Sequence, residues 1–123
     1  MSEIIYVACP YWHDDPTVRQ SRAEIATAYA AHLATKGHAV YSPLTHTVPL
    51  SQLEPEIPEA FWLGNSLAML QHCTEMHLLT LPGWKESKGV RAEWEHCSAA
   101  GKTVVMVMPK LAKHGGGYEF PRL

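Results

Sequence analysis

The chain has 123 residues, of which 46% are hydrophobic and 18% are charged, and its formal net charge at pH 7 is -2. This length accommodates one domain around a single hydrophobic core, and the composition is that of a globular protein rather than a disordered one. The slightly negative charge argues against a nucleic-acid polymer as partner, because such binding needs a basic face.

Neither a targeting signal nor a disulfide framework is expected from the sequence. The opening segment MSEIIYVACPYW contains a glutamate and no basic stretch, so no signal peptide is expected. No apolar run approaches the roughly 20 residues that span a bilayer. Cys9, Cys73 and Cys97 are too few and too scattered for a disulfide framework or a zinc site, which predicts buried free thiols. These features predict a soluble, cytoplasmic protein that does not contact a membrane.

The first half of the chain predicts a strand, a helix and a second strand. Residues 3–9 form a continuous apolar run, as a buried strand does. The segment 15–37 predicts a helix, because its opening Asp-Pro pair suits a helix start and its closing Lys-Gly pair suits a helix end. Residues 38–42 predict the second strand. The segment 44–57 contains several prolines and is expected to be a long loop at the rim of the fold.

The second half repeats the alternation of helices and strands. A helix is expected from about Pro58, followed by a strand over 76–81, a helix over 87–100 and a strand over 103–108. Apolar strands that alternate with helices are typical of a parallel sheet covered on both faces. The sequence therefore predicts an α/β protein with a three-layer flavodoxin- or Rossmann-like fold. Its sheet is expected to hold four or five mostly parallel strands, in one domain over residues 1–123.

Ligands of such folds bind beyond the carboxyl ends of the strands. The predicted topology gathers four segments at that edge, namely CPYWHDD, SPLTHT, LPGWKESKG and the tail KLAKHGGGYEFPRL. Tyr11, Trp12 and Tyr118 make this edge aromatic, which suits a planar heterocycle as ligand. Trp84 is a candidate either to stack on a base or to cap the sheet edge.

The third predicted helix carries two glutamates two positions apart. At about 100° per residue, Glu93 falls on the arc of Val90, Trp94 and Cys97, whereas Glu95 falls on the polar face. A partly desolvated carboxylate near the ligand edge can attack a carbon atom or accept a proton. The alternative is a boundary glutamate whose carboxylate reaches water or caps a neighbouring amide.

Arg22 falls on the apolar stripe of the first helix, close to the same edge. There it can pair with a buried acid or hold a phosphate, and the alternative is a purely structural ion pair. Arg19 is expected in solvent. Ser87 and Gly89 open the third helix in a way that lets an anion approach its free amides. His46 is a candidate ligand contact, although a loop histidine is commonly just exposed.

The motifs resemble the nucleoside 2-deoxyribosyltransferase-like superfamily, and specifically its small bacterial and phage branch, over nearly the whole chain. The residues that carry the resemblance are Tyr6, Ala8, Pro10 and Tyr11; Arg22; Ser42, Pro43, Leu44 and His46; and Leu81, Pro82, Gly83, Trp84, Ser87, Gly89 and Glu93. The last group is the most specific of the motifs.

The resemblance implies cleavage or exchange of the N-glycosidic bond of a nucleoside or a nucleoside 5′-monophosphate, as in the related 2′-deoxynucleoside 5′-phosphate N-hydrolases. It implies that Glu93 attacks the sugar C1′ and forms a covalent glycosyl enzyme. Water as second nucleophile makes the enzyme a hydrolase, and a base makes it a transferase. The expected substrate contacts are Tyr6, Ala8, Pro10, Tyr11, Arg22, His46, Gly83, Trp84, Ser87 and Gly89. No cofactor and no metal are expected, since the eight histidines lack metal-binding spacing.

The resemblance also implies a homodimer or larger oligomer, in which the aromatic tail 118–120 of one copy completes the pocket of another. Relatives carry an aspartate at the start of the third strand, where this chain has Thr74 with Glu75 beside it. Because a threonine cannot act as acid or base, protonation of the leaving base would require Glu75 or another acid to take the place of that aspartate. The alternative function is a non-catalytic nucleotide-binding or sensing module. A flavodoxin-like electron carrier is a third reading, which flavin absorbance would reveal.

Overall fold

The structure is a computed structural model that describes residues 3–112 and 116–123. The four predicted strands are present within two residues of their expected bounds. In chain order the elements are β1 (Ile4–Ala8), α1 (Pro16–Thr35), β2 (Ala39–Tyr41), α2 (Pro43–Leu53), α3 (Glu59–Leu70), β3 (Glu75–Leu79), α4 (Lys88–Ala100), β4 (Thr103–Val107), β5 (Lys110–Leu111) and β6 (Tyr118–Glu119).

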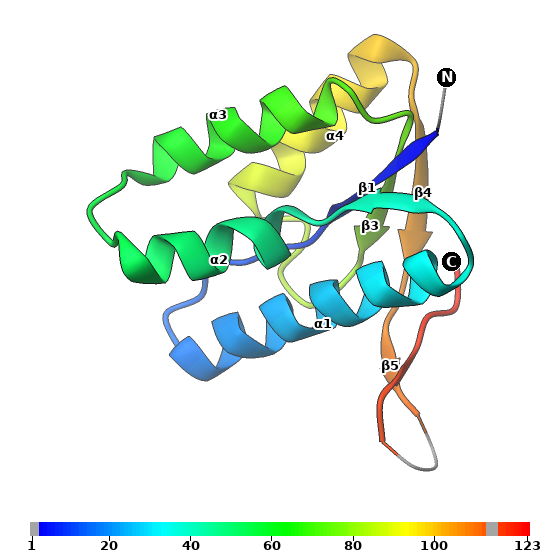
Figure 1. The fold of residues 1–123 in the computed structure, drawn as a ribbon, viewed down its shortest axis with the longest axis horizontal. Helices are drawn as coiled ribbons and strands as arrows, with labels where there is room; N and C mark the ends of the chain where they lie inside the picture. The colour runs from blue at the N-terminus through cyan, green and yellow to red at the C-terminus, as the bar shows by residue number, and fades with distance from the viewer. Residues whose placement is uncertain (1–2, 113–115) are drawn as a thin grey trace.

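The main sheet has the strand order β2-β1-β3-β4, and all four strands run parallel. Tyr6 of β1 lies opposite Tyr41 of β2 on one side and Met76 of β3 on the other. Parallel neighbours need crossover connections, and here helices supply them (Figure 1). The predicted three-layer α/β fold is confirmed, with four strands in the parallel sheet.

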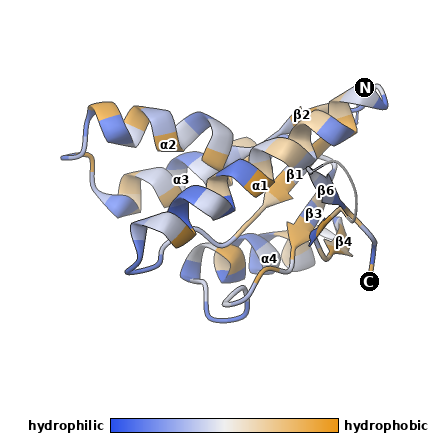
Figure 2. Cartoon of the chain, turned by 90° about the horizontal axis from the view of Figure 1, so that it is seen from below, coloured by the Kyte–Doolittle hydropathy of each residue, from blue (hydrophilic) through white to orange (hydrophobic). Residues whose placement is uncertain are grey.

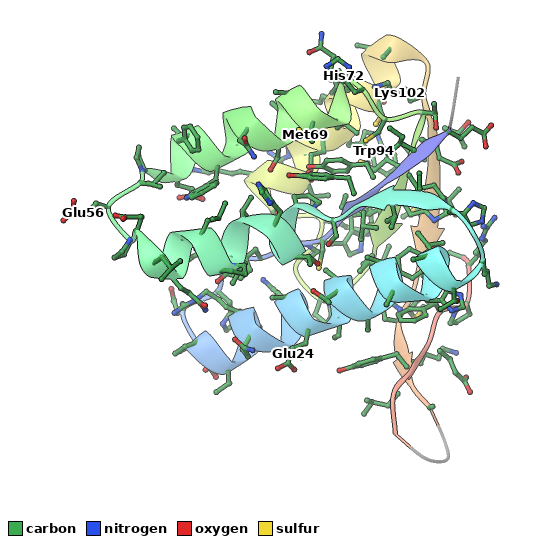
Figure 3. The ribbon with its side chains drawn as sticks, in the orientation of Figure 1. Glu24, Glu56, Met69, His72, Trp94 and Lys102 are labelled. Carbon is green, nitrogen blue, oxygen red and sulfur yellow. The ribbon has the colours of Figure 1, made fainter. Side chains whose placement is uncertain are left out.

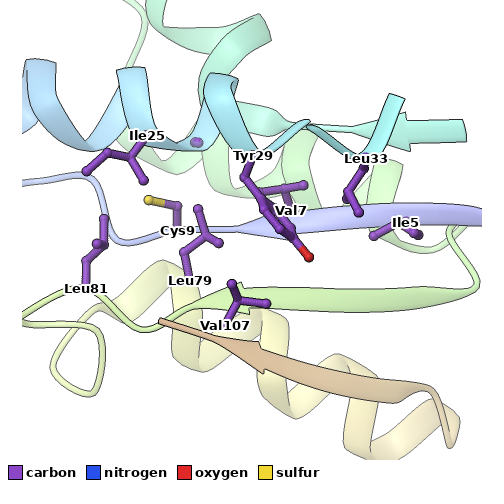
Figure 4. Close-up of a cluster of buried hydrophobic side chains, with 10 residues drawn as sticks. Ile5, Val7, Cys9, Ile25, Tyr29, Leu33, Leu79, Leu81 and Val107 are labelled. Carbon is purple, nitrogen blue, oxygen red and sulfur yellow. The ribbon is translucent and has the colours of Figure 1, made fainter. Parts of the chain in front are cut away.

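Successive residues of β1 point to two hydrophobic clusters, one on each face of the sheet. Ile5 and Val7 belong to the cluster under α1, where Tyr29 faces the strands (Figure 4). Tyr6 and Ala8 belong to the cluster that α3 and α4 cover. In Figure 2, β1, β3 and β4 of the parallel sheet are mostly in hydrophobic colours, as expected for strands buried on both faces. Side chains that point to opposite faces within the sheet are therefore separated by it, and they can share one site only beyond the carboxyl ends of the strands.

The segment 44–57 is not the long loop that its prolines predicted. Residues Pro43–Leu53 form α2, even though Pro49 lies inside the helix. Pro43 occupies the first turn, where its missing amide costs nothing, and Pro43, Thr47 and Val48 bury one face of the helix. Burial of this face outweighs the hydrogen bond that Pro49 cannot donate. The helices α2 and α3 form a hairpin that projects beyond the sheet (Figure 1).

The tail folds back on its own chain. Strands β5 and β6 pair antiparallel, and Arg122 bridges Val107 on the edge strand β4. Tyr118 and Phe120 pack against the cluster under α1, where the Phe120 ring lies 4.9 Å from that of Tyr29. Both side chains are thus partly buried against the core of their own chain, and their contribution to the pocket of a second copy stays a prediction. Residues 113–115 of the tail lie outside the described part of the chain.

All three cysteines are buried free thiols, as predicted. Burial raises the pKa of each thiol, so Cys9, Cys73 and Cys97 stay protonated at neutral pH. Within residues 3–112 and 116–123, the helices lack the length and apolar character needed to cross a membrane.

Candidate functional site

Glu93 is positioned by the turn and the helix that follow β3. After the Pro-Gly-Trp turn (residues 82–84), Ser87 caps α4 by accepting a hydrogen bond from the Val90 amide at 3.2 Å. Glu93 lies in the second turn of this helix and is only 6% exposed, whereas Glu95 lies in solvent. The predicted orientation of the two glutamates is therefore confirmed.

One phenol holds the Glu93 carboxylate. The Tyr6 hydroxyl donates a hydrogen bond to Glu93 Oε2 in a fully buried contact. Among the described residues, no lysine, arginine or histidine nitrogen lies within 4.0 Å of this carboxylate. Burial raises the pKa of Glu93 to about 7, and the Tyr6 hydrogen bond offsets part of the rise. Glu93 therefore changes its charge near neutral pH, as a catalytic carboxylate can.

Removing the Tyr6 hydroxyl should raise the pKa of Glu93 further, because the hydroxyl donates its hydrogen bond to the ionised carboxylate. A hydrogen bond to a charged group contributes about 1.5–3 kcal/mol, so Tyr6→Phe should raise the Glu93 pKa by about 1–2 units. NMR titration of the protein carrying ¹³C-labelled glutamate measures this pKa directly.

Tyr41→Phe is the matched control for this experiment. The Tyr41 ring lies 5.9 Å from the Tyr6 ring, and its buried hydroxyl has no hydrogen-bond partner among the described residues. Losing that hydroxyl should leave the Glu93 titration close to that of the wild type. Equal pKa values in wild type and Tyr6→Phe would show that the phenol does not stabilise the charge of Glu93.

Arg22 is buried, as predicted, but it does not pair with an acid. Its Nη1 donates to the carbonyls of Trp12 at 2.8 Å and Tyr11 at 3.3 Å, and its Nη2 donates to the carbonyl of Pro82 at 2.7 Å. A Cβ on Gly83 would lie 3.0 Å from the same Nη2, and the φ of Gly83 is +89°. The guanidinium therefore joins the loop after β1 to the turn after β3, and a glycine leaves room for it.

The other predicted contacts from the first half of the chain differ in accessibility. Ala8 and Pro10 are fully buried, and Tyr11 is partly buried. His46 lies exposed on α2, with its ring 6.0 Å from that of Tyr41. Ala8 and Pro10 are therefore not accessible from solvent, whereas Tyr11 and His46 are.

Two cavities border the Pro-Gly-Trp turn. The larger, of about 440 Å³, lies at the carboxyl ends of β3 and β4 and is lined by residues 80–86 and 108–109. The smaller, of about 230 Å³, lies beside the rings of Trp84 and Trp94, whose centroids are 6.4 Å apart. Trp84 thus borders both cavities and Gly83 borders the larger one, while Glu93 lines neither. Trp94 is 36% exposed, although its helical position predicted an inward side chain.

Thr74 and Glu75 lie away from Glu93. The Thr74 hydroxyl exchanges hydrogen bonds of 3.0 Å with the backbone of Ile4, where β1 and β3 begin. Glu75 Oε1 lies 3.5 Å from His77 Nε2 on the face of the sheet that α1 covers. Glu93 lies on the opposite face, with Tyr6. Glu75 of the same chain is therefore not placed to protonate a base that leaves from Glu93.

A family model described as "Domain of unknown function (DUF1937)" matches residues 3–109 of the chain. The chain belongs to the DUF1937 family. The matched DUF1937 segment contains the whole parallel sheet, the four helices and every candidate site residue from Tyr6 to Glu93. A comparison with curated proteins gave no match. The family description assigns no activity, so the resemblance to nucleoside deoxyribosyltransferases stays a prediction for this DUF1937 protein.

The DUF1937 domain also contains a buried polar network that the sequence patterns missed. The Tyr29 hydroxyl hydrogen-bonds with His77 Nδ1 at 2.5 Å, and both side chains are buried under α1. Burial raises the pKa of Tyr29 to about 12 and lowers that of His77. A histidine in the mostly apolar run MHLLTL (residues 76–81) was the available signal. Among the described residues of the domain, no three metal-binding side chains come together.

Proposed function

We propose that this protein cleaves or exchanges the N-glycosidic bond of a nucleoside or a nucleoside 5′-monophosphate, with Glu93 as nucleophile. The observation that carries the proposal is the Glu93 carboxylate, which is buried, bonded by Tyr6 and has a pKa of about 7. A carboxylate with little hydration is a better nucleophile than one in water, and a fixed phenol keeps it in one orientation. The resemblance of the motif around Glu93 supplies the substrate class.

The proposed reaction has two displacements at the sugar C1′. A Glu93 oxygen forms a bond to C1′ while the bond from C1′ to the base nitrogen breaks, and the base leaves with the electron pair and takes a proton from solvent. The glycosyl ester is then attacked at C1′ by water or by the nitrogen of a second base, which loses its proton and frees the Glu93 carboxylate. Two inversions give net retention at C1′.

Base release from a panel of ribonucleosides, deoxyribonucleosides and their 5′-monophosphates tests the proposal. We expect free base from at least one panel member by liquid chromatography. Intact-protein mass spectrometry during turnover should show an adduct with the mass of the sugar or sugar phosphate on the peptide that contains Glu93. Release without any adduct, even after rapid quenching, would argue for direct attack by water instead.

A non-catalytic nucleotide-binding module is the second candidate, and one observation favours it. Glu93 lines neither of the two cavities beside the Pro-Gly-Trp turn, so a ligand there need not reach the carboxylate. Binding of a panel nucleotide by calorimetry, without base release, would support this function. If no panel member binds and none is cleaved, both candidate functions are excluded for the compounds of the panel.

We further propose that the protein works as a homodimer. Phe61 and Met69 on α3 and Trp94 on α4 are partly or largely exposed, and Figure 3 labels Met69 and Trp94 on this helical layer. A second copy would remove this apolar surface from water. Sedimentation velocity over a range of protein concentrations measures the mass, and Trp94→Glu should shift the equilibrium towards monomer.

A further inference from the structure

Arg22 makes contacts that link two segments far apart in the sequence. The first is the loop after β1 (residues 9–15), whose carbonyls at Tyr11 and Trp12 accept from Nη1, and the second is the Pro-Gly-Trp turn, whose Pro82 carbonyl accepts from Nη2. Arg22 as a whole residue is only 8% exposed, and among the described residues no carboxylate lies within 4.0 Å of its guanidinium. Three carbonyl oxygens thus take the place of water and of a counter-ion.

The geometry points to Arg22 as a positioning residue that sets the spacing between the first loop and the Pro-Gly-Trp turn, the two segments that flank the candidate site. A planar guanidinium presents donors in fixed directions, so one side chain can hold two loops at a defined separation. We call this link between the first loop and the Pro-Gly-Trp turn the Arg22 clamp. Gly83 leaves room for it, since a Cβ at position 83 would lie 3.0 Å from Nη2.

Other restraints on the Pro-Gly-Trp turn come from its own side of the sheet: Trp84 packs on the cluster under α3 and α4, and Arg91 Nη2 donates to the Lys85 carbonyl at 3.4 Å. Within the turn, the amide of Trp84 donates to Leu81 at 3.1 Å, that of Glu86 to Gly83 at 3.2 Å and that of Ser87 to Trp84 at 3.4 Å. These are local bonds of a single turn, and they do not reach the first loop. The turn leads directly into α4, which carries Glu93. The clamp therefore sets the position of Trp84, which borders both cavities, relative to the first loop.

Arg19 provides a matched control on the same helix. Its Nη1 donates to the carbonyls of His13 at 2.5 Å and Asp14 at 3.4 Å, and its guanidinium lies 4.6 Å from the centroid of the Trp12 ring. Arg19 therefore contacts the first loop alone, whereas Arg22 contacts the first loop and the turn. Comparing variants of the two arginines therefore separates the loss of a contact to the first loop from the loss of the link between the first loop and the turn.

Hydrogen exchange of the ligand-free protein tests the clamp. In Arg22→Lys, peptides covering residues 81–88 and residues 10–15 should both exchange at least about tenfold faster than in the wild type, because a lysine ammonium cannot span three carbonyls. In Arg19→Lys, only the peptide covering 10–15 should change. Wild-type exchange over 81–88 in Arg22→Lys would overturn the assignment.

Arg22→Gln serves as a second variant in case a lysine at this buried position prevents folding, because glutamine buries no charge. Thermal melts monitored by circular dichroism establish that each variant is folded. Faster exchange over 81–88 in Arg22→Gln supports the clamp, and unchanged exchange there overturns it.

The consequence for substrate handling rests on the proposed function. With the panel nucleotide that the wild type cleaves fastest, Arg22→Lys should raise KM at least about tenfold and change kcat by less than about threefold, because positioning acts on binding before chemistry. A drop in kcat at unchanged KM would overturn the positioning role. If the wild type cleaves no panel member, the proposed function fails. The hydrogen-exchange experiment then still tests, independently of activity, whether Arg22 links the first loop to the turn.

Discussion

Glu93→Gln is expected to abolish base release, with kcat reduced by a factor on the order of 10³ or more. Glutamine keeps the shape of the side chain and can still accept the hydrogen bond from the Tyr6 hydroxyl, but its amide oxygen is a very poor nucleophile. The fold should be retained, since the variant buries no additional charge. Single-turnover release of base from the fastest panel nucleotide measures the loss.

The wild-type pH profile belongs to the same prediction. A nucleophilic carboxylate must be ionised, so kcat/KM should rise with pH through the Glu93 pKa of about 7 and level off above it. Glu95→Gln, which changes an exposed carboxylate on the same helix, is the control and should retain wild-type activity. Full activity of Glu93→Gln would show that Glu93 is not the nucleophile.

Glu93→Gln should also change how stability depends on pH. The pKa of Glu93 rises from 4.5 in the unfolded chain to about 7 in the folded protein, because burial penalises the charged form. Below pH 4.5 the group is protonated in both states and carries no penalty. Between pH 4.5 and about 7 the unfolded chain ionises while the folded protein keeps Glu93 neutral, so stability falls over this window and is constant above it. At about 1.36 kcal/mol per unit, ionisation of Glu93 lowers the free energy of unfolding by about 3 kcal/mol.

Chemical denaturation at pH 4.5 and pH 8 measures this effect. The free energy of unfolding of Glu93→Gln, minus that of the wild type, should be larger at pH 8 than at pH 4.5 by about 3 kcal/mol, since glutamine does not ionise. Glu95→Gln should show no comparable change, because its carboxylate meets solvent in both states. A difference that does not vary with pH would mean that the folded protein does not penalise the Glu93 charge.

Stability and the proposed activity therefore place opposite demands on Glu93. The nucleophile needs the ionised form, whereas the folded protein favours the neutral form. The Tyr6 hydroxyl is the one side-chain donor described for this carboxylate, and it favours the ionised form. Natural proteins commonly lose stability where a functional group is held in an unfavourable environment.

The amino-acid sequence by itself determined the layers of the fold and the direction of the key side chains. Apolar runs of strand length, separated by helical periodicity and helix caps, were enough to predict the four parallel strands and the helices α1 and α4. The same periodicity placed Glu93 inward and Glu95 outward, and it buried Arg22. These features depend on the spacing of residues along a single element, which the sequence states directly.

Tertiary structure decided everything that depends on contacts between elements. The helix α2 forms despite Pro49 because its buried face packs on the rest of the protein. Arg22 meets three carbonyls rather than an acid, and Glu75 lies on the other side of the sheet from Glu93. Arg22 and Pro82, for example, are 60 residues apart in the chain. Periodicity tells which way a side chain points, but only the packed chain determines what it meets there.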